Sequence, residues 1–270
     1  MDFDFSDDQQ QLRDAVRKWV DKGYDFERRR KAVAAGGFDR AAYNELAELG
    51  LAGLYVPEAD GGLGMGPVEG MVVMEELGRG IVLEPLAQTL IAGGVLSGYA
   101  GDTLKAPWLP KIAAGEALVV LAYQERRGRY QLGACETTAT QSGAAWSLNG
   151  LKNVVAAGDQ ADAFIVPATV NGQIALFLVE RGAAGVTTRG YGTQDGARAA
   201  DLQLDLGDRL EQFFRGARHG RDVLRGLLGA GGGVLGAGAR MFGDGREAVG
   251  GHRHLLGVAG DGPERAAHVR

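Results

Sequence analysis

The stretch AFIVPATVNGQIALFLV, residues 163–179, carries the clearest local signal of structure in the chain. Two runs rich in β-branched and aromatic residues flank the pair Asn171-Gly172. This pair is favoured in two-residue hairpin turns because both positions must adopt a positive φ. The stretch therefore predicts two strands joined by a tight turn.

Further strand signals lie on both sides of this hairpin. A run typical of a buried strand starts at Ala117, and residues 145–155 alternate in polarity and then turn. Two more strands are predicted over GVTTRGY (185–191) and AADLQLDL (199–206). We therefore expect residues 117–210 to form an antiparallel, barrel-like β domain.

The residues before this domain are predicted to be helical. Ser6 and Gln9 fit a capping box, in which each side chain bonds a free backbone amide at the helix start. Pro67 suits the first turn of a helix, and Asp102 is expected to cap the last helix. Apolar residues recur at helical spacing, and those expected to face inward are Leu12, Val16, Trp19, Val20, Tyr43, Leu46 and Ala47. The predicted fold class is α+β, with an all-helical domain over residues 1–116.

The bulk composition is that of a globular protein, with 45% hydrophobic and 23% charged residues among 270. The net charge of −5 does not favour nucleic acid or an anionic membrane as a partner. The single cysteine, Cys135, excludes an internal disulfide, and the acidic start MDFDFSDDQQ lacks the pattern of a secretory signal. We expect a cytoplasmic protein that binds neither nucleic acid nor membrane.

The last part of the chain has a different composition. Residues 216–270 contain sixteen glycines and all four histidines, but no Ser, Thr, Asn, Gln or Lys. The residue types that remain mostly have codons beginning with G or C, which a GC-rich gene gives when it is read out of frame. Our interpretation is that residues 211–270 are a Gly/Arg-rich, out-of-frame and poorly ordered segment.

A glycine motif within this segment suggests an alternative. Gly231, Gly233 and Gly236 match G-x-G-x-x-G, a spacing that can hold a pyrophosphate at the start of a helix. The segment could then be a nucleotide-binding module. In so glycine-rich a string, with no β-α-β context, we attribute the match to coincidence.

Three segments that precede residue 211 resemble segments of the acyl-CoA dehydrogenase family and follow one another in the family's order. The family's early helical region, with its V-P-E, G-G-x-G and E-E-L-G elements, is similar to LAELGLAGLYVPEADGGLGMGPVEGMVVMEELGRG (46–80). Its L-N-G-x-K and G-x-x-A-D stretch resembles WSLNGLKNVVAAGDQADAFIV (146–166), and its G-x-R-x-x-D segment resembles DGARAAD (195–201). The small subunits of heteromeric members, such as that of pimeloyl-CoA dehydrogenase, resemble the chain more narrowly in YDFERRRK, ERRGRYQL and GYGTQDGARAA.

The resemblance implies a helical domain, a β domain and a C-terminal four-helix domain, with FAD as cofactor and acyl-CoA as substrate. It implies α,β-dehydrogenation, in which a glutamate takes the α-proton and FAD takes a hydride from the β-carbon. The family's glutamate lies in the four-helix domain, which has no counterpart in residues 211–270. We therefore expect that domain to be absent, and we name no catalytic residue and no metal site.

The chain departs from the family at the flavin. The family's flavin-contacting segment reads A-x-T-E-P-x-x-G-S-D, and AYQERRGRY (122–130) stands in its place. Hydroxyl groups that would bond the flavin are replaced there. After the lysine of NGLK, the tryptophan and threonine that the family places beside the flavin ring are replaced by Val154 and Ala156. The resemblance places the cofactor contacts at Gln124, Glu125, Gly128, Arg129, Tyr130, Val154, Val155 and Ala156.

Several other charged or polar residues are candidates for a functional site. Arg126 and Arg127 are candidates for binding the CoA phosphates or the far carboxylate of a dicarboxylyl-CoA, because a guanidinium matches both anions; the alternative is a solvated strand end. We interpret the run ERRRK (27–31) as a solvated helix face. Glu75 and Glu76 are not expected to be catalytic, and Cys135 is not expected to be a reactive thiol. His252 and His254 are not expected to bind a metal ion.

The resulting prediction is a truncated acyl-CoA dehydrogenase-like subunit that is inactive alone. Its intact relative would use FAD to dehydrogenate an acyl-CoA, such as pimeloyl-CoA. The alternative is a non-catalytic partner subunit in a heteromeric enzyme. In either case the expected protein partner is a large acyl-CoA dehydrogenase subunit or a second copy of the chain.

Overall fold

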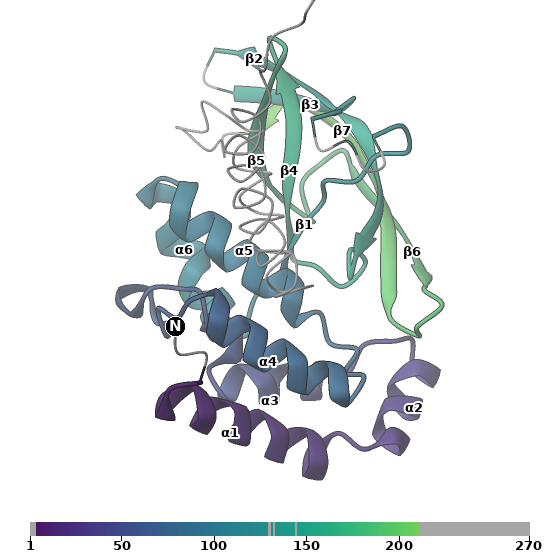
Figure 1. The fold of residues 1–270 in the computed structure, drawn as a ribbon. Helices are drawn as coiled ribbons and strands as arrows, with labels where there is room; N and C mark the ends of the chain where they lie inside the picture. The colour runs from purple at the N-terminus through teal and green to yellow at the C-terminus, as the bar shows by residue number, and fades with distance from the viewer. Residues whose placement is uncertain (1–3, 129–130, 132, 144, 211–270) are drawn as a thin grey trace, which may run out of the picture.

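The computed structural model describes residues 4–128, 131, 133–143 and 145–210. Arg129, Tyr130 and residues 211–270, with the glycine motif and the histidines, lie outside the described residues. Helices come first and strands follow, which confirms the predicted α+β class. Figure 1 shows the two halves stacked, with the helices below the sheet.

The helical half begins as the sequence predicts. Ser6 and Gln9 form the capping box, and Pro67 is the first residue of its helix. The prediction for Asp102 is wrong by one position, because Gly101 is the N-cap and Asp102 lies in the first turn, where a carboxylate also suits the helix dipole. The elements are α1 (Asp7–Gly23), α2 (Phe26–Ala34), α3 (Arg40–Glu48), η1 (Leu51–Gly53), η2 (Glu58–Asp60), α4 (Pro67–Arg79), α5 (Leu86–Tyr99) and α6 (Asp102–Ala113).

The strands form one curled sheet in the order β1-β4-β2-β3-β7-β6, with β5 pairing β4 on its other side. The register of the central antiparallel pair, β3 with β7, shifts between Lys152 and Val155, which marks an irregularity in the ladder. The strands are β1 (Val119–Leu121), β2 (Thr138–Ser142), β3 (Ala145–Ala156), β4 (Ala163–Val170), β5 (Gln173–Glu180), β6 (Val186–Gly192) and β7 (Arg198–Leu210).

The predicted hairpin is confirmed as β4–β5. Val170 pairs with Gln173, and the two residues between them have φ of 49° and 77°, the positive values that such a turn requires. Pro167 lies inside β4. Along this edge of β4, residues 163–165 pair with β1 and Thr169 pairs with β2, so Pro167 falls between the two pairings. A residue without an amide hydrogen is tolerated at such a gap in the ladder.

The expectation of a wholly antiparallel sheet is wrong at two pairings. β1 lies parallel to β4, and β2 meets β4 in parallel at Thr138 and Thr169. Parallel strands need a long connection between them, and residues 122–162 supply it. Local sequence patterns do not report on pairings of that range.

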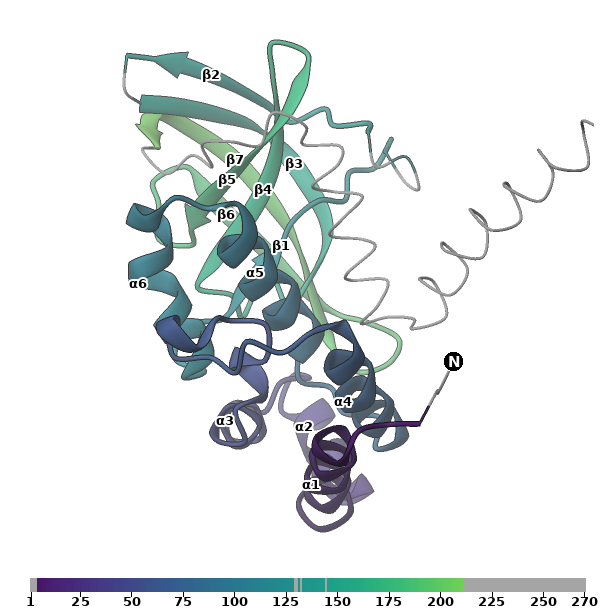
Figure 2. The ribbon, with the colours of Figure 1, turned by 60° about the vertical axis from the view of Figure 1, so that its left-hand side comes forward.

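Helix α5 joins the two halves through the core. Its first turns, with Leu86 and Leu90, pack among the other helices, whereas Leu96 packs against Ile165 and Leu176 of the sheet. Figure 2 shows α5 lying beside the sheet next to β1. Although α5 is apolar on most sides, none of the described helices is both long and apolar enough to cross a membrane.

A second contact between the halves involves α2 and the β6–β7 turn. Arg29 donates from Nη2 to the carbonyl oxygen of Asp195 at 2.6 Å and from Nε to the carbonyl oxygen of Ile81 at 3.0 Å. Val33 packs over Gly196 so closely that a Cβ there would lie 2.7 Å from its Cγ2. Figure 1 shows α2 below the tip of this turn. The run ERRRK is therefore not simply a solvated face.

Candidate functional site

A buried ion pair joins β3 to residues 122–130, the segment that replaces the flavin-contacting motif. Glu125 follows β1 and Lys152 lies on β3, and these two residues are 3% and 0% exposed. Lys152 Nζ stands 2.6 Å from Glu125 Oε1, and Thr137 donates to the same oxygen from Oγ1 at 2.6 Å and from N at 3.0 Å. The Glu136 amide donates to the other carboxylate oxygen. Both charges are thus paired inside the domain.

These contacts determine the ionisation of Glu125. Burial by itself would raise the pKa of this carboxyl, but the hydrogen bonds from Lys152, Thr137 and the Glu136 amide outweigh burial and lower the pKa to about 2. The ionised carboxylate fastens both ends of the 125–137 loop to β3. The Glu125 side chain is a structural anchor, so any contact of Glu125 with a cofactor would come from its main chain.

Cys135 borders this ion pair. Its thiol lies 3.3 Å from the carbonyl oxygen of Pro167 and 3.6 Å from Lys152 Nζ. Burial raises the pKa of the Cys135 thiol, which keeps it in the neutral, unreactive form at neutral pH. That Cys135 is not a nucleophile stays a prediction.

The second predicted segment, residues 154–156, forms a strained bulge in β3. Val154 has φ of 51°, in the left-handed region that a β-branched residue rarely adopts. Asp201 on β7 holds this conformation, because its Oδ1 accepts from Asn153 Nδ2 at 3.2 Å and from the Val154 amide at 3.4 Å. Tyr191 donates to the same oxygen at 3.4 Å. Strain maintained by surrounding contacts is a feature of functional sites.

The structure brings the two predicted segments side by side. The Asn153 amide donates to the Gln124 carbonyl oxygen at 2.8 Å, so the loop and the bulge share a main-chain contact. Val154 and Ala156 are exposed, whereas Val155 points into the core and is 2% exposed. Whether these residues and Gly128 contact a cofactor stays a prediction.

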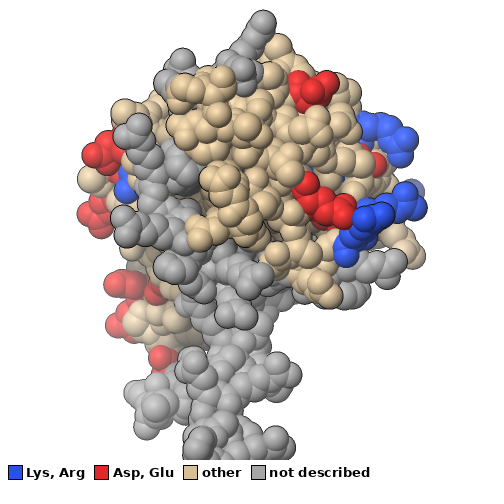
Figure 3. All heavy atoms as spheres, turned by 90° about the horizontal axis from the view of Figure 1, so that it is seen from above, with Lys and Arg blue, Asp and Glu red and all other residues tan. Residues whose placement is uncertain are grey.

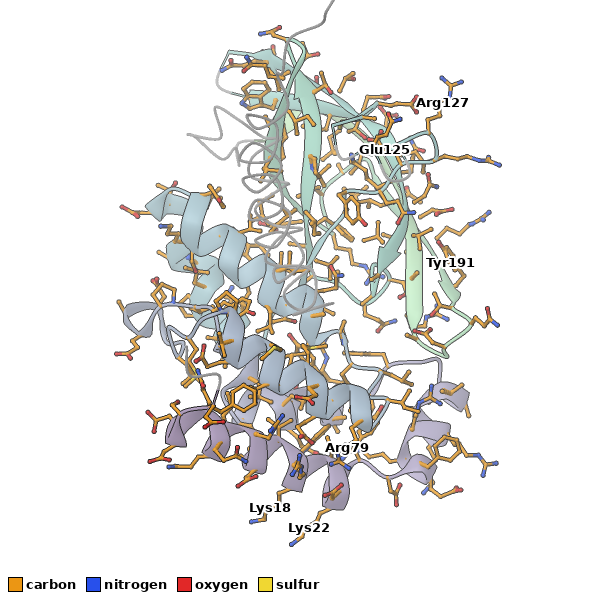
Figure 4. All side chains as sticks on the ribbon, in the orientation of Figure 1. Lys18, Lys22, Arg79, Glu125, Arg127 and Tyr191 are labelled. Carbon is orange, nitrogen blue, oxygen red and sulfur yellow. The ribbon has the colours of Figure 1, made fainter. Side chains whose placement is uncertain are left out.

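The basic residues of the loop face solvent. Arg126 is exposed, and the Arg127 side chain is 85% exposed with Nη1 3.5 Å from Glu136 Oε1. Figure 4 shows Arg127 pointing away from the sheet, while Glu125 lies inside the loop. Seen from above in Figure 3, Lys and Arg side chains gather on one side of the β domain, beside acidic ones. The loop can therefore present positive charge to an anion.

The two residues that hold the bulge and the loop in place, Asp201 and Lys152, were not predicted as site residues. Both lie inside motifs that the sequence shows, DGARAAD and NGLK. Their partners stand 47 and 27 positions away, at Val154 and Glu125. The motifs drew attention to the segments, but only the fold shows what these side chains bind.

The remaining carboxylates considered from the sequence have structural roles. Glu76 is 2% exposed and its carboxylate is bound by Arg17 at 2.6 Å and by Arg79 at 2.9 Å. Figure 4 shows Arg79 between α1 and α4. The Glu75 side chain is 59% exposed and pairs with Arg13. Among the residues that the structure describes, no group of three His, Cys, Asp or Glu side chains is placed to hold a metal ion.

Comparisons with known proteins identify the family. The profile described as "Acyl-CoA dehydrogenase, N-terminal domain" matches residues 6–116, and the profile described as "Acyl-CoA dehydrogenase, middle domain" matches residues 121–206. The chain belongs to the acyl-CoA dehydrogenase family. The family resemblance and the fold it implies for the described residues are thereby confirmed.

Curated and solved relatives agree with this assignment. The acyl-CoA dehydrogenase FadE27 of Mycobacterium tuberculosis is 29% identical over 169 residues, which are 62% of this chain and 44% of that protein. The ChsE4–ChsE5 complex of M. tuberculosis contains a chain that is 26% identical, with a TM-score of 0.76 over 85% of this chain and 62% of that one. A glutaryl-CoA dehydrogenase from Mycobacterium smegmatis in complex with FADH2 is 22% identical, with a TM-score of 0.76 over 84% of this chain and 60% of that one.

The extent of these matches is itself informative. This acyl-CoA dehydrogenase-like chain spans less than two thirds of the length of each of these relatives. The matched parts are the N-terminal and middle domains.

The residues around the bulge fit one part of a flavin. Val154 offers an exposed apolar side chain held by a rigid main chain, which suits the face of a ring system. The Asn153 Oδ1 atom is buried and has no hydrogen-bond partner among the described residues. The family's hydroxyl donors to the ring and phosphates are replaced in residues 122–130, and its tryptophan and threonine beside the ring are replaced by Val154 and Ala156, so the fit is limited to an apolar contact with the face of the ring.

Proposed function

We propose that this chain is a subunit of a heteromeric, FAD-dependent acyl-CoA dehydrogenase and that its β3 bulge supports the flavin ring. The observation that carries the proposal is the bulge itself. Asp201, Lys152 and Glu125 fix the position of residues 152–156, and the strained Val154 stays exposed at its tip. Such rigidity is useful where a ring must be oriented against a substrate.

Bound FAD would supply the hydride acceptor, and this chain would bind and orient. Main-chain atoms of Gln124, together with Val154 and Ala156, would line the ring. Gly128 is buried, and its amide and carbonyl bond Glu125 and Gln131, so it shapes the loop instead. The two carboxylates that contact these segments, Glu125 and Asp201, are both engaged in internal hydrogen bonds. The proton-abstracting base is therefore proposed to come from another subunit.

For the substrate we propose an acyl-CoA with a second carboxylate, such as pimeloyl-CoA. Arg126 and Arg127 support this proposal because both are exposed on the same loop as the proposed flavin contacts. A guanidinium binds either a phosphate or a carboxylate with two parallel hydrogen bonds. Replacing both arginines by glutamine should raise KM for pimeloyl-CoA more than KM for the monocarboxylic heptanoyl-CoA; equal effects would assign the arginines to the CoA phosphates.

The proposal is tested by co-expressing the tagged chain with a full-length acyl-CoA dehydrogenase subunit from the same organism and counting FAD per complex. We expect two FAD per pair of chains, falling to one with Val154→Asp, because a carboxylate would be forced against the ring. Leu151→Asp is the matched control, since Leu151 lies on the same strand and is similarly exposed (44% against 49%). Failure of the chain to associate with any such subunit would refute the proposal.

A second candidate is the non-catalytic partner subunit. It is favoured by the replaced hydroxyl groups of the flavin segment and by the internal use of both carboxylates. One FAD per pair of chains, unchanged by Val154→Asp, would support this candidate over the first.

A further inference from the structure

A hollow on the helical half lies apart from the proposed flavin segment. It is a groove of about 310 Å³ between one face of α2 and the start of α3. The wall on α2 consists of residues at helical spacing, and the other wall is the turn that leads into α3. The lining residues are Arg28, Lys31, Ala32, Ala35, Phe38, Asp39, Arg40 and Ala41.

The charges of this groove do not cancel. Arg28 is paired with two carboxylates, Asp39 at 3.1 Å and Glu45 at 2.9 Å, so this trio carries a net charge of −1. Lys31 and Arg40 are both exposed, and neither forms an ion pair with any of the described residues. With Lys31 and Arg40 the groove and its bordering Glu45 hold three cations against two carboxylates, so the net charge there is positive in a chain whose net charge is −5.

The guanidinium of Arg40 is held in place before any ligand arrives. It lies over the ring of Phe38, 5.1 Å from the centroid, and over the ring of Tyr43 at 5.5 Å. Stacking of this kind stabilises the cation and leaves the N–H groups at its edge free to bind an anion. Less side-chain entropy is then lost when a ligand binds.

The floor of the groove is apolar. It consists of the buried Ala32, which is 4% exposed, and the half-buried Phe38, and the exposed Ala35 and Ala41 also line the groove. Its volume lies at the lower end of the range for small-molecule sites. A compact ligand with an apolar body and a doubly negative group matches both the floor and the two cations.

We propose that this groove binds a small organic phosphate monoester, with Lys31 and Arg40 holding the phosphate and the alanine-lined floor holding the apolar body. A phosphate monoester carries between about 1.5 and 2 negative charges at neutral pH. Arg and Lys differ in a way that suits this ligand, since Arg bonds two phosphate oxygens and Lys acts as a point charge.

The test uses phenyl phosphate as the probe and the full-length ¹⁵N-labelled chain. We expect saturable amide shifts confined to residues 28–43, weakened at high salt because ion pairs are screened. Inorganic phosphate should bind more weakly, and benzyl alcohol, which is neutral, should cause no shifts there. Shifts spread over the whole chain, or equal shifts with benzyl alcohol, would overturn the proposal.

Charge-reversal variants make the test specific. Arg40→Glu and Lys31→Glu should each weaken phenyl phosphate binding about tenfold or more, which is the loss expected for one charge-assisted contact. Glutamate is well tolerated in the first turn of a helix, so α3 should still form in Arg40→Glu, and the exposed Lys31 provides an independent variant.

Lys18→Glu is the matched control, because Lys18 is an exposed lysine on α1 that does not line the groove (Figure 4). Unchanged affinity in Arg40→Glu and Lys31→Glu, or an equal loss in Lys18→Glu, would show that the groove has no specific phosphate site. The experiment needs neither FAD nor a partner subunit, so its outcome is independent of the proposed dehydrogenase role.

Discussion

The ion pair of Glu125 and Lys152 can be broken by the single substitution Lys152→Met, which keeps the length of the side chain. The carboxylate then stays buried without its cation. Removing one partner of a buried pair costs about 3–5 kcal/mol. Hydrogen bonds from Lys152, Thr137 and the Glu136 amide together outweigh burial and lower the pKa of Glu125 to about 2, so Lys152 supplies part of the stabilisation of the ionised form.

The measurement is urea unfolding at pH 7, followed by circular dichroism. We expect the free energy of unfolding to fall by about 3 kcal/mol in Lys152→Met. The control is the double variant Glu125→Gln/Lys152→Met, which leaves no buried charge and should recover part of that loss. A loss below about 1 kcal/mol in the single variant, or a double variant less stable than the single one, would contradict the reasoning.

The same pair predicts a pH dependence. Because the folded-state pKa of Glu125 is lowered, its stabilising contribution is complete above the unfolded-state pKa near 4.5 and is lost as the pH falls towards 2. The wild-type protein should therefore lose more stability over this interval than the double variant. Parallel pH profiles of the two proteins would exclude this explanation.

Three further perturbations follow from the fold. Asp201→Ala removes the acceptor that fixes the bulge. Hydrogen exchange of the Val154 amide should become faster, while exchange in the rest of the sheet is unchanged. An unaltered exchange rate at Val154 would show that the bulge does not depend on Asp201. Arg29→Met removes one hydrogen bond between the halves, to Asp195, and one within the helical half, to Ile81, and should cost about 1–3 kcal/mol in urea unfolding. Arg30→Met, which loses only an exposed ion pair, should cost less than about 0.5 kcal/mol. Gly172→Val places a β-branched residue at φ of 77° and should lower the free energy of unfolding by about 1–2 kcal/mol; a thermal melt that matches wild type would refute the need for a positive φ there.

Local features were predicted well from the sequence. The capping box at Ser6 and Gln9, the helix start at Pro67 and the hairpin at Asn171-Gly172 each depend on a few neighbouring residues and their backbone angles. The family motifs likewise located the two segments that meet at the β3 bulge. In these cases the interacting groups are close in the sequence, so the pattern and the contact coincide.

Contacts between distant residues were not predicted. Glu125 was expected at a cofactor, yet its carboxylate is bound by Lys152, and a charged run on α2 proved to join the two halves through Arg29. The parallel pairing of β1 with β4 was missed for the same reason. A side chain's charge is visible in the sequence, but its partner is not.

The sequence by itself determined the order of helices and strands, the hairpin turn and the family, because these follow from local conformational preference and from motifs that survive as continuous stretches. Only the tertiary structure decided which charges are buried and paired, how Val154 is held at a positive φ, and that Lys31 and Arg40 form no ion pair within the described part of the chain. Those properties depend on the packing of chain segments that lie tens of residues apart. Burial determines the energy of a charge, and a residue is buried only once that packing has formed.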